Sequence, residues 1–360
     1  MKKERDNYFD NFRAFLIVMV VIGHYFGPLA KQYEMIACIQ KIIFIFHMPA
    51  FVFISGYFSK KNDWIKLIKT LLIPYLALQI IFYFLYNYIW GVPKDFSLLT
   101  PGYTLWFLLC LFVWRIFVTK AAKIKGIIPI LFCIGILAGF SPEIGTFFSL
   151  SRMITFFPYF LLGYRFDKEK IMKWADRKVS YILAGAILTA ITIWMAFNHT
   201  QIRIKLLEGC CSYDSINLQD GWIQRGLLYL VSTVMIYALA VLMPKKRHTF
   251  SYLGSRTMGI YMIHGAIFKT IVNCTNWYDY LKTPAGLMAL MLFSLAMCLI
   301  LSTKVVDRAV RVLTSVPFEY LINENDPVKQ HRIGAQHGKG HDQRETVATY
   351  LTVFRPFIFR

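Results

Sequence analysis

Three histidines, His24, His47 and His264, fall inside long apolar segments of this chain. Ionisable side chains are costly in lipid, and where they occur they usually mark a pathway or a site. Imidazole exchanges protons near neutral pH, and burial favours its neutral form, which can act as a base. Such a base could deprotonate a hydroxyl that attacks an acyl carbon. It could equally carry a proton in a transporter, or only join two helices by a hydrogen bond.

The spacing of the histidines predicts how deep they lie. His24 follows Arg13 by eleven residues, about 16 Å along a helix, and His47 lies equally far from the end of its own segment. We therefore expect His24 and His47 to meet in the interior, and this matched depth above Arg13 favours a functional site. His264 lies seven residues into its segment, about 10 Å from the end, on one helical face with Tyr261. For Tyr261 and His264, lining a cavity and packing between helices are both open.

Ten apolar segments must position these side chains. They span approximately 14–30, 42–58, 71–90, 104–118, 126–140, 148–164, 180–197, 224–243, 257–273 and 285–303. Most are near the length that crosses a hydrocarbon core of about 30 Å, and 104–118 and 126–140 are the shortest. An open chain satisfies its backbone groups in lipid only as helices. The sequence therefore predicts an all-α polytopic bundle of about ten transmembrane helices.

The distribution of charge sets the predicted orientation. Of the residues, 57% are hydrophobic and 17% charged, against about 25% charged in a soluble domain, and the formal net charge is +20. The basic residues lie between the apolar segments and not in one patch, which argues against a nucleic-acid partner. They concentrate in alternate connections, at 2–5, 60–69, 120–125, 165–178, 245–247 and 304–311. By the positive-inside rule these connections and both termini are cytoplasmic, in a multi-pass protein of the cell (cytoplasmic) membrane surrounded by membrane lipids.

Two domains are expected, a membrane-embedded part at 1–318 and a polar, mobile cytoplasmic tail at 319–360. The tail holds three histidines, which we interpret as solvated side chains and not as metal ligands. The seven cysteines lack C-x-x-C and zinc-like spacing. The sequence therefore predicts no metal site.

A set of short motifs follows a fixed order through the apolar segments. They are Asp10-Asn11-Phe12-Arg13 with His24 after ten more residues, Phe46-His47-Met48-Pro49, Ser55-Gly56-Tyr57, Pro74-Tyr75, Leu105-Trp106-Phe107, Tyr159-Phe160-Leu161-Leu162-Gly163 and Tyr261-Met262-Ile263-His264. In these motifs, from residue 8 to about 305, the chain resembles the acyltransferase-3 family of membrane O-acyltransferases. The fucose 4-O-acetylase-like subgroup is the most similar.

The resemblance implies an enzyme that takes acetyl-CoA as co-substrate on the cytoplasmic side. Its acceptor would be a hydroxyl of a glycan or lipid-linked sugar at the outer face. Arg13 and His24 match the family's essential pair, and His47 matches the histidine of its second helix. We expect His24 to act as base or acyl relay, oriented by Arg13 or Asp10, while His47 positions the acceptor or shares the proton.

The resemblance also predicts binding residues. Where the family often has an arginine pair entering the third helix, this chain has Lys66 and Lys69, which keep the charge but lack the planar fork that grips phosphate. With them, Ser55, Gly56 and Tyr57 form the predicted cofactor-binding set, although small residues there also pack helices.

Three aromatic residues on later segments form the predicted substrate-binding set, namely Trp106, Tyr261 and His264. For Trp106, aromatic packing near an interface is the alternative to stacking on substrate.

A second class of function is open at this point. A proton-coupled transporter or exporter of a polysaccharide or small molecule would also use intramembrane histidines. Transporters often consist of paired halves, and the sequence contains no such repeat. A purely structural membrane protein would leave two buried histidines without a role. The sequence therefore favours the O-acyltransferase.

Overall fold

A computed structural model describes residues 6–61 and 63–314, and over these residues the chain is helical, without strands. Each of the ten predicted segments contains one principal helix. These are α1 (Asn7–Phe26), α2 (Glu34–Tyr57), α4 (Ile73–Phe84), α5 (Trp106–Ala121), α6 (Ile127–Leu137), α7 (Leu150–Tyr164), α9 (Lys178–Asn198), α11 (Gly221–Leu242), α13 (Thr257–Cys274) and α15 (Pro284–Leu301). The all-α prediction is confirmed, and the predicted tail at 319–360 lies outside the described residues.

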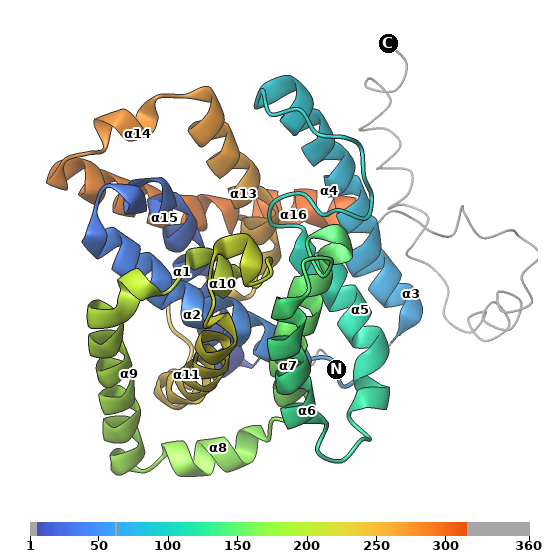
Figure 1. The fold of residues 1–360 in the computed structure, drawn as a ribbon, viewed down its shortest axis with the longest axis vertical. Coiled ribbons are helices and arrows are strands. Elements are labelled where there is room, and N and C mark those ends of the chain that lie inside the picture. The colour runs from blue at the N-terminus through green and yellow to red at the C-terminus, as the bar shows by residue number, and fades with distance from the viewer. Residues whose placement is uncertain (1–5, 62, 315–360) are drawn as a thin grey trace, which may run out of the picture. The chain divides into compact units, whose positions relative to one another are not determined.

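Shorter helices connect the principal ones. They are α3 (Trp64–Leu67), α8 (Lys168–Ala175), α10 (Ile204–Glu208), α12 (Ser251–Gly254), α14 (Trp277–Tyr280) and α16 (Lys304–Thr314). Two π-helical turns, Ile68–Leu72 and Leu85–Ile89, flank α4, so the chain stays helical from residue 64 to 89. Further 3₁₀ turns lie at Gly27–Lys31, Ala138–Phe140, Phe147–Ser149, His199–Gln201 and Asp214–Ile216. Figure 1 shows α8 lying between the end of α7 and the start of α9.

Six helical segments in the described part are long and apolar enough to cross a membrane. They are Asn7–Lys31, Glu34–Tyr57, Trp64–Ile89, Lys178–Gln201, Gly221–Leu242 and Pro284–Leu301. Large apolar side chains on them face outward, such as Ile182, Leu230 and Leu292, which are 72%, 63% and 60% exposed. Surfaces of this kind favour lipid over water, so the chain is a multi-pass membrane protein. Four of the ten predicted segments do not qualify. The helices α5, α6 and α7 have only 16, 11 and 15 residues, and α13 has 18 residues but includes the polar His264, Lys269 and Asn273.

The backbones of α2 and α7 approach each other closely at two glycines. A Cβ atom on Gly56 would overlap the carbonyl oxygen of Phe160, and one on Gly163 would overlap that of Phe53. Small residues allow such contact between membrane helices. The structure therefore gives Gly56 a packing role, the alternative that the sequence left open.

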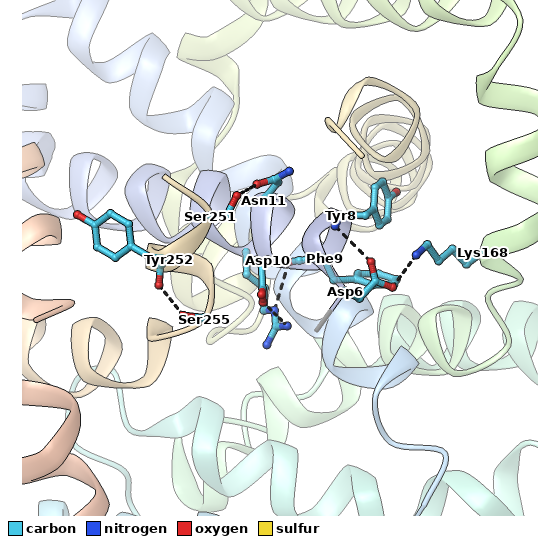
Figure 2. A network of polar contacts seen from close by, with 10 residues as sticks. Asp6, Tyr8, Phe9, Asp10, Asn11, Lys168, Ser251, Tyr252 and Ser255 are labelled. Carbon is cyan, nitrogen blue, oxygen red and sulfur yellow. Dashed lines mark hydrogen bonds and ion pairs between the residues drawn. The ribbon is translucent and has the colours of Figure 1, made fainter. Parts of the chain in front are cut away.

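The start of α1 is fixed by polar contacts (Figure 2). The Asn11 side-chain amide donates to the carbonyl oxygens of Pro244 and Lys246, both at 2.8 Å. Its Oδ1 atom accepts from the Ser251 hydroxyl, a contact that Figure 2 shows. Asp6 accepts from the Tyr8 backbone N–H and pairs with Lys168 on α8 at 2.5 Å. These contacts hold α1 against the residues that lead into α12 and against α8. They therefore determine where the rest of α1, including His24, lies.

Candidate active site

One cavity of about 530 Å³ is lined by all three predicted histidines, His24, His47 and His264. Its lining includes Thr257 at the start of α13 and Lys269 twelve residues later, which on a helix is about 18 Å. The cavity therefore extends across much of the bundle. Arg13, Ser55 and Thr257 lie at one end, and Lys94, Arg152, Glu208 and Lys269 lie at the other.

His24 meets a residue that the sequence analysis missed. Its Nδ1 atom lies 2.9 Å from the hydroxyl oxygen of Tyr103. Tyr103 has a φ of 24°, in the left-handed region that a tyrosine adopts only at a cost. Its neighbours hold it there, because Gly102 N–H donates to Gln79 Oε1 at 2.9 Å and the Tyr261 hydroxyl donates to the Thr104 carbonyl. No spacing rule links a loop tyrosine to a helical histidine, although Pro101-Gly102 signals a turn just before it.

The histidine next to His24 is His264, with ring centroids 5.6 Å apart. His47 lines the same cavity, but the Phe44 ring lies between, 5.8 Å from the His24 ring and 4.8 Å from the His47 ring. His24 and His47 therefore line the same cavity without the direct contact that the sequence predicted. The histidine ring that lies against His24 is that of His264.

Backbone carbonyls fix the tautomers of two of the histidines. The Nδ1 atom of His47 lies 2.9 Å from the carbonyl oxygen of Ile43, and that of His264 lies 2.8 Å from the carbonyl oxygen of Ile260. A carbonyl only accepts, so Nδ1 carries the proton and Nε2 is the unprotonated nitrogen of each neutral ring. His264 is fully buried, and its Nε2 atom has no hydrogen-bond partner among the described residues. A buried acceptor without a partner is unfavourable, so this atom suits a hydrogen bond from a ligand.

Arg13 lines the cavity at a distance from His24. Its Nη2 atom pairs with Asp10 at 2.9 Å, its Nε donates to the Phe9 carbonyl, and its guanidinium lies over the Phe58 ring at 5.0 Å. Asp10 itself is buried and does not line the cavity. Eleven residues of helix separate Arg13 from His24, about 16 Å. The orientation of His24 by Arg13 or Asp10 therefore stays a prediction, and the hydrogen bond that the described structure gives His24 is the one to Tyr103.

The predicted cofactor set divides in two. Ser55 lines the cavity, whereas Gly56 packs against α7 and the Tyr57 ring stacks on α1. Lys66 on α3 is exposed, and Lys69 in the following π turn is half-buried. Neither lysine lines the cavity.

All three residues of the predicted substrate set, Trp106, Tyr261 and His264, line the cavity. Trp106 stacks on Phe156 at 5.5 Å and carries the Arg152 guanidinium over its ring at 5.0 Å. Trp106 therefore packs against Phe156 and also lines the cavity, and its stacking on substrate stays a prediction.

Four charged residues at the far end of the cavity were also missed. Lys94, Arg152 and Glu208 lie in or beside connections, where no periodicity distinguishes them. Lys269 carried a signal, because it is a lysine inside the apolar segment at 257–273.

A comparison with protein families matches most of this chain. The family model Acyl_transf_3, an acyltransferase domain, matches residues 6–303, which include the described helices up to the end of α15 and every cavity-lining residue named above. Comparisons with curated proteins and with solved structures give no match.

Proposed function

Because this chain belongs to the acyltransferase-3 family, and is thereby a membrane acyltransferase, we propose that it moves an acetyl group from cytoplasmic acetyl-CoA to a hydroxyl of a cell-surface or lipid-linked glycan. One observation carries the proposal: His24 contacts Tyr103 and adjoins His264 within a cavity that extends from Arg13 to Lys269. A donor arriving at one end and an acceptor at the other could meet at these side chains. Among the family's members, the motifs favour the fucose 4-O-acetylase-like subgroup.

The proposed orientation has ten spans in the cell membrane, with both termini cytoplasmic. It places the Arg13 end of the cavity on the cytoplasmic side and the Lys269 end on the outer side. Contacts of basic residues on the cytoplasmic side support it: Arg165 donates to the Ala122 and Ile124 carbonyls after α5, and Lys168 pairs with Asp6. These residues keep the basic connections together at one end of the bundle, as the positive-inside rule requires.

The tautomer of His24 decides which atom acts as the base. If Nδ1 carries the proton and donates to the Tyr103 hydroxyl oxygen, Nε2 is free to accept a proton. In the proposed step, Nε2 takes the proton of the acceptor hydroxyl as its oxygen attacks the acetyl carbonyl carbon. A C–O bond forms, the thioester C–S bond breaks, and the His24 imidazolium returns the proton to the CoA thiolate. General base catalysis of this kind contributes about 10²- to 10⁴-fold to a rate.

The other residues of the site would bind and position the substrates. The Nε2 atoms of His264 and His47 would accept hydrogen bonds from sugar hydroxyls, and Trp106 would contact the sugar face. Lys66 and Lys69 would attract the phosphates of CoA outside the cavity, each as a point charge.

The test uses the purified full chain in nanodiscs with radiolabelled acetyl-CoA and membranes that contain the natural glycans. Wild type should transfer label to a glycan fraction, and His24→Ala should lose at least 100-fold of that rate while its melting temperature stays within a few degrees. Equal transfer by both proteins would refute the assignment of His24. No turnover of acetyl-CoA in nanodiscs, together with substrate movement that requires a proton gradient in sealed proteoliposomes, would favour a transporter instead.

A further inference from the structure

Three cationic side chains line the end of the cavity that lies away from Arg13, and we call them the cation cluster: Lys94, Arg152 and Lys269. Each lies over an aromatic ring of the lining. The Lys94 ammonium is 4.1 Å from the Tyr86 ring centroid, the Arg152 guanidinium is 5.0 Å from that of Trp106, and the Lys269 ammonium is 4.9 Å from that of Tyr103. Stacking of this kind holds the three charges in place without neutralising them.

The cluster has little compensating negative charge. Among the described residues that line the cavity, Glu208 is the sole carboxylate. No member of the cluster lies within ion-pair distance of a carboxylate in the described part of the chain. Arg152 Nε instead donates to the backbone carbonyl of Glu208 at 3.1 Å, and Lys269 lies within electrostatic reach of Lys94 as well as of Glu208. Three cations facing one carboxylate leave an excess of positive charge at this end.

The positive-inside rule does not account for this cluster. In the proposed orientation the cluster lies on the outer side, where connections are poor in lysine and arginine. Lys94 lies in the connection before α5 and is exposed, but Arg152 and Lys269 are half-buried on α7 and α13 and line the cavity, unlike lysines that only reach toward water from a lipid-facing helix. A role toward a ligand explains the placement of these charges better.

The cluster is close to the reacting groups. Lys269 follows His264 by five residues on α13, about 7.5 Å. Its ammonium lies over the Tyr103 ring, whose hydroxyl contacts His24. An anion bound at the cluster and a hydroxyl at His24 could therefore belong to the same sugar or to neighbouring sugars of one acceptor.

We propose that the cation cluster binds an anionic group of the acceptor, so that this enzyme acetylates acceptors that carry such a group and not uncharged glycans. The proposal rests on the acyltransferase function argued above and names the class of its acceptor. Two sources present the same chemistry: the carboxylate of an acidic sugar, or the phosphoryl group that links a sugar to its lipid carrier.

Binding tests the proposal without turnover. The full chain in detergent is titrated with glucuronate, glucose 1-phosphate and glucose, and binding is followed by saturation-transfer NMR. At least one anionic probe should bind about tenfold more tightly than glucose, and Lys269→Gln and Lys94→Gln should each lose about tenfold. Lys269→Arg should keep the affinity. Lys282→Gln, which removes a lysine paired with Asp279 outside the cavity, is the matched control and should bind like wild type.

The outcomes separate the two proposals. His24→Ala should lose transfer but keep probe binding, so a failed activity assay leaves the binding result valid. Preference for glucuronate assigns an acidic sugar, and preference for glucose 1-phosphate assigns a phosphoryl-linked one. Equal binding of glucose and both anions, or full affinity in a folded Lys269→Gln, would overturn the inference. In the transfer assay, Lys269→Gln should raise KM for the acceptor and leave KM for acetyl-CoA unchanged, and the reverse would assign this end to the donor.

Discussion

The Nδ1 atom of His24 lies 2.9 Å from the hydroxyl oxygen of Tyr103, although 79 residues separate the two in the sequence. The contact joins a helical residue to a loop residue whose backbone is held in the left-handed region. Gln79 and Tyr261 pin the residues on either side of Tyr103. An imidazole that is hydrogen-bonded through one ring nitrogen has a defined orientation. Whether that nitrogen donates or accepts decides which of the two ring nitrogens carries the proton. The pinned loop therefore serves to orient the candidate base.

Replacing Tyr103 by phenylalanine should slow transfer without abolishing it. The variant keeps the aromatic ring over which Lys269 lies, but it removes the hydroxyl that bonds to His24. One neutral hydrogen bond is worth about 1 kcal/mol. We expect kcat to fall about five- to tenfold, with KM for acetyl-CoA unchanged. Steady-state kinetics with labelled acetyl-CoA measure both constants. An unchanged kcat in Tyr103→Phe would show that the contact does not orient a catalytic group.

A different signature is expected at His264. Its unprotonated Nε2 is buried and without a partner in the described part of the chain, which suits a hydroxyl of the acceptor. His264→Ala should raise KM for the acceptor about tenfold, as expected for loss of one hydrogen bond to a ligand in a buried site. If water takes the place of the acceptor, any resulting hydrolysis of acetyl-CoA should continue in His264→Ala, whereas His24→Ala should lose both transfer and hydrolysis. If His264→Ala abolishes hydrolysis as fully as His24→Ala does, His264 belongs to the proton-transfer chemistry itself.

The helices and the three histidines were predictable because lipid imposes strict rules. Every apolar segment had to be helical, and an imidazole at mid-depth of such a segment needed a reason. The packing role of Gly56 was one of two alternatives. A glycine allows another group to approach closely, but the sequence does not show whether that group is a ligand or a neighbouring helix. Lys269 was predictable in the same way as the histidines, because it is an ionisable side chain inside an apolar segment.

The contacts made by loops were not predictable. Tyr103 reaches His24 only because Gln79, from another helix, fixes the turn before it. The sequence motif also suggested that Arg13 acts on His24, since both belong to one signature. A helix rises about 1.5 Å per residue, so eleven residues hold them apart and leave Arg13 paired with Asp10.

Adding one methyl group at the crossing of α2 and α7 should destabilise the protein. In Gly56→Ala the new Cβ would overlap the backbone of Phe160, which cannot move aside as a side chain can. Overpacking of this kind costs about 1–3 kcal/mol, so the melting temperature in detergent should fall by several degrees. The matched control is Gly185→Ala on α9, where a Cβ meets nothing within 4 Å. It should be neutral or stabilising by up to about 1 kcal/mol, and equal melting temperatures for the two variants would contradict the close crossing.

The reactivity of Cys211 should depend on its neighbour. The two sulfur atoms of Cys210 and Cys211 lie 3.2 Å apart in the connection before α11. A hydrogen bond from the Cys210 thiol lowers the pKa of Cys211, and the positive charge of Lys205 acts in the same direction. The thiolate is the form that reacts with a maleimide, so labelling of Cys211 should persist at pH values where an ordinary thiol is protonated, and should fail only as the pH drops through the lowered pKa. In Cys210→Ala the midpoint of this profile should move to higher pH, while Cys210→Ser, which keeps a donor, should stay near wild type.

The rate is read by mass spectrometry after labelling intact cells with a membrane-impermeant maleimide from pH 5 to 9, a range set by the reference pKa of about 8.5 for a free thiol. Identical profiles in wild type and Cys210→Ala would remove the hydrogen bond as the cause, and labelling that requires broken cells would place this connection on the cytoplasmic side.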